Sequence, residues 1–249
     1  MGTQVSVLFD LDGTLLDHVG ASNSAVIDAL DRAWMPGHDL SEERVLAEWA
    51  RLEALHMAEY LAGEVDFAEQ RRRRLRGLLA SAGDERVLDD VAADLAFKAY
   101  LAAYESHWHA FPDVAPTVRQ LHKRGVPFAM LSNGDRGQQL SKAASLELPI
   151  GARVLVPADV GAAKPDAAAF IGACEALQWD PRRVLYVGDN PEVDARGSRF
   201  AGLSACWVNR TSEPSPFEAD EGIHEIEDLR GLVELVQELQ SDLRATPST

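Results

Sequence analysis

Two aspartates, Asp10 and Asp12, stand at the end of the first apolar stretch of the chain with one residue between them. The preceding run from Val5 to Phe9 predicts a buried strand, in which alternate side chains point to the same side. Two carboxylates placed in this way repel each other, which is typical of a bound cation or a shared proton. Because Asp also favours turns, the pair alone is equally consistent with a simple turn at Gly13. The ends of the other predicted strands decide between these interpretations.

Polar residues also follow two later apolar runs, 126–131 and 183–187. They are Ser132, Asn133 and Gly134 after the first run, and Asp189 and Asp194 after the second. Lys164 stands between these groups, just before Pro165, where a helix reaching Leu177 is predicted to begin. Ligands of open parallel sheets bind at the carboxyl ends of the strands, so we expect all these side chains at one edge. Acids, a hydroxyl, loop amides and one lysine suit a phosphoryl group held beside a hard cation.

Strands and helices alternate from residue 112 to the last predicted helix, at 228–239. This alternation is typical of a parallel sheet covered on both faces, with further strands at 153–156 and 203–208. Residues 210–222 are rich in Pro, Ser and acids and predict a loop. Residues 21–105 repeat apolar residues at helical spacing, without a strand pattern. Four helices are predicted there, at 21–34, 41–63, 66–79 and 84–105, with Ser41 and Asp66 as N-caps. The sequence therefore predicts an α/β fold with five or more parallel strands and one inserted helical module.

Composition restricts the classes of partner. The 249 residues carry a formal net charge of −16, so the field of the whole protein repels phosphates and argues against nucleic-acid or anionic-membrane binding. Hydrophobic residues make up 46% of the chain, enough for a buried core. Cys174 and Cys206 lie in apolar stretches, and we expect buried thiols rather than a disulfide or a zinc site. The sequence has neither the pattern of a signal peptide nor an apolar run of membrane-spanning length, so we expect a cytoplasmic location.

These groups resemble the four motifs of the haloacid dehalogenase-like hydrolase superfamily. Asp10 to Leu15 matches its Asp-x-Asp-Gly-Thr-Leu sequence, and Ser132 matches its Ser or Thr after an apolar strand. Lys164-Pro165 matches its Lys-Pro pair, and Gly188-Asp189 followed by Asp194 matches its acidic sequence. The resemblance covers about residues 1–20 and 107–240 and preserves the order of the motifs. It implies a Rossmann-like parallel sheet core at 1–17 and 110–249, with an all-helical cap domain inserted at 18–109.

The resemblance also implies a Mg²⁺-dependent phosphatase for a small soluble phosphomonoester. Asp10 is then the nucleophile that forms an aspartyl-phosphate, and Asp12 is the general acid and base. The implied Mg²⁺ ligands are Asp10, Asp12 through its backbone carbonyl, Asp189 and Asp194. The implied phosphoryl-binding residues are Thr14, Ser132, Asn133, Gly134 and Lys164. Thr14 would also orient Asp10, and Lys164 would stabilise both the nucleophile and the transferred phosphate.

Other activities share some of these residues. A phosphomutase of the same superfamily shares all the core residues. A haloacid dehalogenase needs neither Asp12, because halide leaves without a proton, nor a cation. Bacterial receiver domains combine similar residues, but they are about half as long, and their phosphorylated Asp ends the third strand rather than the first. The physiological phosphomonoester, the cap residues that select it and the oligomeric state stay open.

Five arginines, Arg71 to Arg74 and Arg76, stand out in the predicted helical module. Successive residues of a helix point around its whole circumference, so these side chains form no single stripe. The run is interpreted as a solvated helix paired with neighbouring acids. The alternative hypothesis is that one of the arginines binds a substrate anion.

Overall fold

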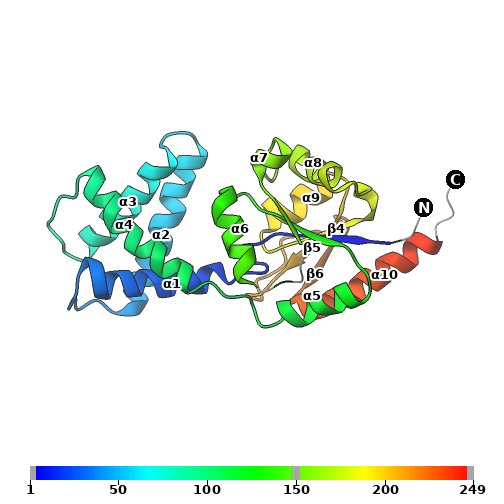
Figure 1. Ribbon diagram of the computed structural model, residues 1–249, viewed down its shortest axis with the longest axis horizontal. Coiled ribbons are helices and arrows are strands. Elements are labelled where there is room, and N and C mark those ends of the chain that lie inside the picture. The colour runs from blue at the N-terminus through cyan, green and yellow to red at the C-terminus, as the bar shows by residue number, and fades with distance from the viewer. Residues whose placement is uncertain (1–3, 147, 149–151, 246–249) are drawn as a thin grey trace. The chain divides into compact units, whose positions relative to one another are not determined.

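The computed structural model describes residues 4–146, 148 and 152–245 and forms two compact units. One unit consists of Met1–Asp17 with His109–Thr249, and the other of His18–Trp108. The first unit, which we call the sheet unit, has a sheet with helices on its faces (Figure 1). The second, which we call the helical unit, consists of helices and the loops that connect them. In the part of the chain that is described, no helix has the length and apolar character needed to cross a membrane.

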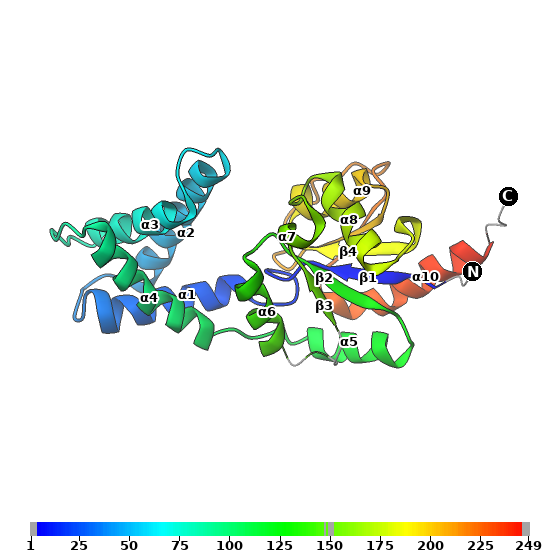
Figure 2. The same cartoon turned by 45° about the horizontal axis from the view of Figure 1, so that its top comes forward.

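The sheet unit contains six parallel strands in the order β3-β2-β1-β4-β5-β6. The strands are β1 (Ser6–Phe9), β2 (Phe128–Leu131), β3 (Arg153–Leu155), β4 (Val184–Gly188), β5 (Ser204–Val208) and β6 (Ile223–Ile226). Figure 2 shows β1 in the middle of the sheet, between β2 and β4. The predicted α/β fold with a Rossmann-like parallel sheet is confirmed. The sequence pattern does not predict β6, because its Ile-His-Glu-Ile run is short and its side chains are half buried or exposed.

Helices of the sheet unit lie on both faces of the sheet, with α5 and α10 on one face and α8 and α9 on the other (Figure 1). The helices are α5 (Val114–Lys123), α6 (Arg136–Ser145), α7 (Pro157–Val160), α8 (Ala167–Leu177), η2 (Pro181–Arg183), η3 (Pro191–Arg196), α9 (Gly197–Phe200), η4 (Leu229–Gly231) and α10 (Leu232–Ala245). The prediction that α8 begins at Pro165 is wrong by two residues, since the Asp166 carboxylate caps the helix by accepting from the Ala168 N–H. Tyr186 and Phe170 are fully buried between β4 and α8.

The helical unit comprises α1 (His18–Ala29), the π-helical segment η1 (Leu30–Trp34), α2 (Glu42–Leu61), α3 (Phe67–Ser81) and α4 (Asp90–Ser106). Ser41 and Asp66 cap α2 and α3 as predicted, through the N–H groups of Arg44 and Glu69. The last helix begins at Asp90 rather than near residue 84, because the Asp89 carboxylate supplies the N-cap. Trp34, Trp49 and Tyr100 pack at the centre of its core.

The arginine run of α3 forms ion pairs within the helical unit. Arg72 pairs with Asp94 and Asp90, Arg73 with Glu59 and Glu69, Arg74 with Glu53, and Arg76 with Asp90. The Arg71 guanidinium lies over the Phe67 ring, 4.3 Å from its centre. The predicted pairing with acids is therefore confirmed for Arg72, Arg73, Arg74 and Arg76. The expectation that the side chains are solvated is wrong for Arg74, which is buried with its guanidinium over the Trp49 ring.

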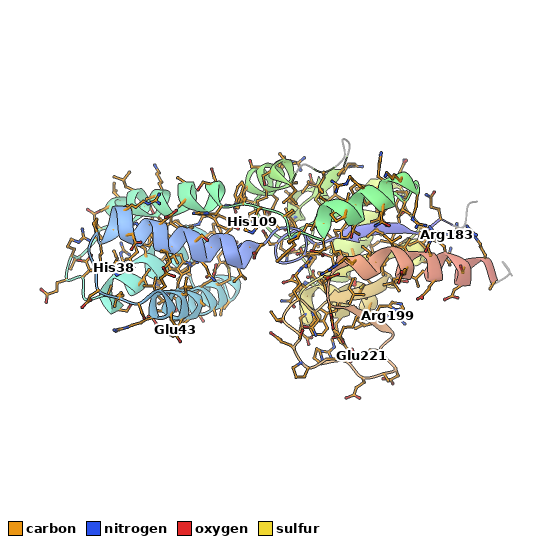
Figure 3. All side chains as sticks on the ribbon, turned by 90° about the horizontal axis from the view of Figure 1, so that it is seen from below. His38, Glu43, His109, Arg183, Arg199 and Glu221 are labelled. Atoms are coloured by element: carbon orange, nitrogen blue, oxygen red, sulfur yellow. The ribbon has the colours of Figure 1, made fainter. Side chains whose placement is uncertain are left out.

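The connection between β5 and β6 is fastened to the sheet unit by charged groups. Arg199 Nε donates to the backbone oxygen of Glu221, and Figure 3 labels both residues. Arg210 donates to both carboxylate oxygens of buried Asp113, at 3.1 and 3.0 Å, and to the Thr14 carbonyl at 2.8 Å. The same carboxylate accepts from the Leu229 N–H at 2.7 Å. Asp113 therefore joins the start of α5, the β5–β6 connection and η4, and Arg210 extends this link to the loop after β1.

We expect Asp113→Ala to lower the free energy of unfolding by about 3 kcal/mol, because it leaves the Arg210 guanidinium and the Leu229 N–H without their carboxylate. Chemical denaturation measures the loss. The control is Arg182→Ala, since the Arg182–Asp180 pair is exposed and such pairs contribute little. Equal stability of the Asp113 variant and the wild type would show that this ion pair does not fasten the loops.

Candidate active site

The site lies where the order of the strands reverses, at the carboxyl ends of β1 and β4. Asp10 follows β1 directly, and Asp189 follows Gly188, the last residue of β4. These strands are neighbours, and the crossover connections leave them in opposite directions across the sheet. Such a reversal opens a crevice for ligands between the strand ends. Ser132 lies at the end of β2, on the other side of β1.

Three carboxylates meet in this crevice. Asp10, Asp189 and Asp194 each offer an oxygen, and these oxygens lie within 4.8 Å of one another. Two glycines allow the approach: a Cβ at Gly13 would lie 2.2 Å from Asp189 Oδ2, and one at Gly188 would lie 2.5 Å from the Asp194 side chain. Gly13 also has a φ of +82°, which favours glycine. The chain therefore requires glycine at both positions for the carboxylates to gather.

Lys164 binds two of these carboxylates. Its buried ammonium donates to Asp10 Oδ1 at 2.6 Å, to Asp194 Oδ1 at 2.7 Å and to the Tyr186 hydroxyl at 2.7 Å. An ammonium has three hydrogens, so these three acceptors use all of them. A contact between Lys164 and a phosphoryl oxygen, which the sequence predicts, therefore requires one of these bonds to be exchanged.

Tyr186 and Trp207 support the cluster, and sequence reasoning missed both. The Tyr186 hydroxyl accepts from Lys164 and shares its own hydrogen between the Leu131 carbonyl at 3.2 Å and Asp194 Oδ1 at 3.1 Å. Trp207 Nε1 donates to the Asp189 carbonyl at 2.7 Å. Both residues belong to apolar strands, where an aromatic ring is ordinarily a core residue. The only signal is that the polar atom of a buried Tyr or Trp needs a partner.

The residues predicted to bind phosphate contact different groups of the protein in the structure. Thr14 is buried and donates from Oγ1 to Asp10 Oδ2 at 3.4 Å, so it contacts the predicted nucleophile. The Asn133 side chain donates to the Lys164 carbonyl at 2.7 Å and accepts from the Lys164 N–H at 2.8 Å. Asn133 therefore holds the Lys164 backbone with both of its polar atoms. Gly134 adjoins Gln139 of α6, where a Cβ would lie 2.0 Å from Gln139 Nε2.

Asp12 faces α6 rather than the group of three carboxylates. Its two oxygens accept from Lys142 Nζ at 2.7 and 2.9 Å, and Oδ2 also accepts from Gln139 Nε2 at 2.9 Å. The same Gln139 nitrogen donates to Ser132 Oγ at 2.9 Å. If Asp12 contributes to a cation site, that contribution falls to its backbone carbonyl, as the family resemblance implies. Lys142 and Gln139 are further residues that sequence reasoning missed.

The electrostatics of the three-carboxylate group fit a divalent cation. Burial raises the pKa of Asp10 well above its ordinary value, against the opposing effect of Lys164. Burial and the charge of Asp194 raise the pKa of Asp189 to about 7. Burial alone would lower the pKa of Lys164, but Asp10 and Asp194 raise it above its ordinary value. When all three carboxylates are ionised, they leave an excess of two negative charges around the one ammonium, which a divalent cation with oxygen ligands would neutralise.

Proteins of known family resemble this chain in sequence. The family model of the haloacid dehalogenase-like hydrolases matches residues 6–202, and the chain belongs to this family. Phosphoserine phosphatase from Thermus thermophilus is 29% identical over 90% of this chain and 96% of the relative. Glyceraldehyde 3-phosphate phosphatase from Methanopyrus kandleri is 28% identical over 95% of this chain and 99% of the relative. An (S)-2-haloacid dehalogenase from a Pseudomonas species is 29% identical over 93% of this chain and 94% of the relative.

Solved structures share the fold. The HAD-hydrolase YfnB from Bacillus subtilis, in a structure bound to magnesium, superimposes with a TM-score of 0.76. It is 22% identical to this chain, and the match covers 94% of this chain and 99% of YfnB. A haloacid dehalogenase, RSc1362, superimposes with a TM-score of 0.68 at 25% identity, over 94% of this chain and 99% of the other. The sequence relatives include phosphatases and a dehalogenase, and a dehalogenase shares the fold, so the site has to distinguish the two activities.

We expect Tyr186→Phe to lower the free energy of unfolding by about 2 kcal/mol. The substitution removes only the hydroxyl oxygen, but it leaves one N–H of the buried Lys164 ammonium without an acceptor. Chemical denaturation measures the change, and Tyr60→Phe is the control because that side chain is partly exposed. A Tyr186→Phe protein as stable as the control would mean that the hydroxyl does not support Lys164.

Proposed function

We propose that the protein is a Mg²⁺-dependent phosphatase that hydrolyses a small phosphomonoester through a phosphorylated Asp10. One observation carries this proposal: the sheet edge holds two separate acidic systems. The group of Asp10, Asp189 and Asp194 suits a cation, whereas Asp12 lies outside it and is held by Lys142 and Gln139. A phosphatase of this family needs both systems, a cation site and a proton donor.

Asp10, Asp189, Asp194 and the backbone carbonyl of Asp12 would hold the ion. When bound, Mg²⁺ supplies the positive charge that allows an anionic nucleophile and an anionic phosphate to approach each other. Lys164 keeps its own positive charge in this crevice because Asp10 and Asp194 stabilise it. The residues of this chain then carry the proton and phosphoryl transfers.

In the first half-reaction the Asp10 carboxylate forms a bond to phosphorus, and the bond between phosphorus and the ester oxygen breaks. Asp12 gives its proton to the leaving alkoxide and becomes a carboxylate. Ser132 donates its hydroxyl hydrogen to a phosphoryl oxygen, and Thr14 holds the second oxygen of Asp10. The products of this step are the free alcohol and the aspartyl-phosphate.

In the second half-reaction a water molecule attacks phosphorus and gives a proton to the Asp12 carboxylate. The bond between phosphorus and Asp10 breaks, so that inorganic phosphate leaves and the Asp10 carboxylate is restored. Asp12 thus ends the cycle protonated, as the first half-reaction requires, whereas its ionised form is the one that Lys142 and Gln139 hold in the structure. We assign this chemistry to the sheet core, 1–17 and 110–249, and selection of the alcohol to the helical cap, 18–109.

The alternatives predict different products. A dehalogenase, the activity named for one of the relatives, would need neither the Asp12 proton nor the cation. A phosphomutase would return the phosphoryl group to a sugar rather than to water. The phosphatases among the relatives are named for phosphoserine, glyceraldehyde 3-phosphate and ribulose 1,5-bisphosphate, which are all small molecules. We therefore place the substrate in the class of small phosphate esters.

Purified protein should release p-nitrophenolate and phosphate from p-nitrophenyl phosphate in the presence of Mg²⁺, and a chelator should stop the reaction. Asp10→Asn should lower kcat by at least about a thousandfold, because the amide cannot attack phosphorus. A parallel assay for halide release from 2-chloropropionate should show no turnover. Undiminished phosphatase activity in the Asp10 variant, or halide release by the wild type, would contradict the proposed reaction.

Mg²⁺ should raise the melting temperature of the wild type at a pH of about 8, where Asp189, with a pKa of about 7, is mostly ionised. The raised pKa means that the metal-free fold loses stability as the pH rises through this value. Asp189→Asn should therefore melt at a higher temperature than the wild type without Mg²⁺, yet gain less from Mg²⁺. Differential scanning fluorimetry measures both effects, and Asp166→Asn, outside the crevice, is the control. An equal Mg²⁺ response in the Asp189 variant would exclude Asp189 from the ion site.

A further inference from the structure

Helix α6 places two buried polar side chains, Gln139 and Lys142, against the predicted active site. They stand three residues apart and so share one face of the helix. Figures 1 and 2 show α6 next to the end of β1. Gln139 is 2% exposed and Lys142 is 3% exposed, whereas Leu140 between them is 44% exposed. This helix therefore buries polar residues and exposes an apolar one, the reverse of an ordinary surface helix.

Lys142 is bound to Asp12 through both carboxylate oxygens. The distances of 2.7 and 2.9 Å define a close ion pair between a buried ammonium and a carboxylate that is 26% exposed. Burial of a lysine is unfavourable unless a charge compensates it, so Asp12 and Lys142 constrain each other's position. Lys142 is distinct from Lys164, which binds Asp10 and Asp194.

Gln139 connects Asp12 with Ser132. Its amide nitrogen donates to both, each at 2.9 Å, which uses its two hydrogens. Its Oε1 is buried and has no hydrogen-bond partner among the described residues. Leaving a buried acceptor unpaired costs about 1–3 kcal/mol, and such a cost is typical of a functional constraint. Gly134 makes the arrangement possible, because a side chain there would collide with the amide.

The amide also determines where Ser132 directs its hydrogen. Because Ser132 Oγ accepts from Gln139, its own hydrogen is available for another acceptor, such as a phosphoryl oxygen. One glutamine therefore orients both the side chain that would transfer a proton to the leaving group and the hydroxyl that would bind the phosphate. These two groups have to face the same substrate for the reaction to proceed.

We propose that Lys142 and Gln139 of α6 are positioning residues, which hold the Asp12 carboxyl group at the site of proton transfer. In its ionised form, the one held here by both residues, Asp12 takes a proton from water. Once protonated, it exchanges one of these hydrogen bonds and donates to the leaving group. The inference rests on the proposed phosphatase function. It assigns to α6 the alignment of the general acid with the phosphoryl-binding hydroxyl. Neither residue touches the phosphorus atom in this scheme, and both act through Asp12.

The test compares two classes of leaving group. A p-nitrophenolate leaves without a proton, whereas an alkoxide requires one from Asp12. Because kcat/KM reports only the steps up to release of the first product, it isolates the first half-reaction. The alkyl substrate is the phosphomonoester that the wild type hydrolyses fastest in a phosphate-release panel. Lys142→Met should lower kcat/KM for this ester at least about tenfold more than for p-nitrophenyl phosphate.

A double-mutant cycle shows whether Lys142 acts through Asp12. Asp12→Asn should produce the same selective loss for the alkyl ester. Addition of Lys142→Met to this variant should change the alkyl-to-aryl ratio by less than about twofold. Lys142→Arg should lower the alkyl-to-aryl ratio of kcat/KM less than Lys142→Met does, because arginine keeps the positive charge. Lys123→Met, an exposed lysine on α5, is the matched control and should behave as the wild type.

Gln139→Leu tests the same inference without leaving a buried charge, and it replaces Lys142→Met if that variant does not fold by circular dichroism. Equal loss for alkyl and aryl esters, or full additivity with Asp12→Asn, would overturn the positioning role. In either case the wild type would still hydrolyse phosphomonoesters. A wild type that hydrolyses no phosphomonoester would instead refute the proposed function.

Discussion

The structure of the site depends on the contact between the Lys164 ammonium and the carboxylates of Asp10 and Asp194. All three groups are buried, and without the lysine the fold would hold three carboxylates in one crevice with no positive charge. Removing one partner of such a buried group is strongly destabilising, so the contact constrains the elements around it. Asn133 holds the Lys164 backbone from the loop after β2, and Tyr186 holds its side chain from β4.

Two lysines bind three of the four acids at this edge. Lys164 binds Asp10 and Asp194, Asp189 lies beside them, and Lys142 binds Asp12. This division separates the carboxylate that would attack phosphorus from the one that would move protons, although they are two residues apart in the chain. The turn at Gly13 accompanies the separation, since the Asp189 carboxylate occupies the space that a side chain there would need. The same fold serves dehalogenases, so the arrangement of Asp12, rather than the sheet, favours a phosphatase.

The sequence predicts those features that depend on neighbouring residues. The strand before Asp10, the caps at Ser41 and Asp66, and the polar residues after the strands follow from local patterns. The roles of Tyr186, Gln139 and Lys142 depend on contacts between distant segments, and each residue is ordinary within its own element. The sequence does not predict β6, because its four residues are half polar and do not form a clear strand pattern on their own. Its strand conformation depends on pairing with β5, which the local sequence does not show. For Gln139 and Lys142, the available signal is a polar pair on the face of α6 where apolar residues are expected.

The central claim is that Asp10 accepts the phosphoryl group. The most direct measurement is mass spectrometry of acid-quenched Asp12→Asn protein after mixing with p-nitrophenyl phosphate and Mg²⁺. The aryl leaving group needs no proton, whereas release of phosphate needs the missing base, so the covalent intermediate should accumulate. The account predicts a phosphorylated peptide with the modification on Asp10. A phosphoryl group on another residue, or phosphate release by this variant without any covalent adduct, would contradict it.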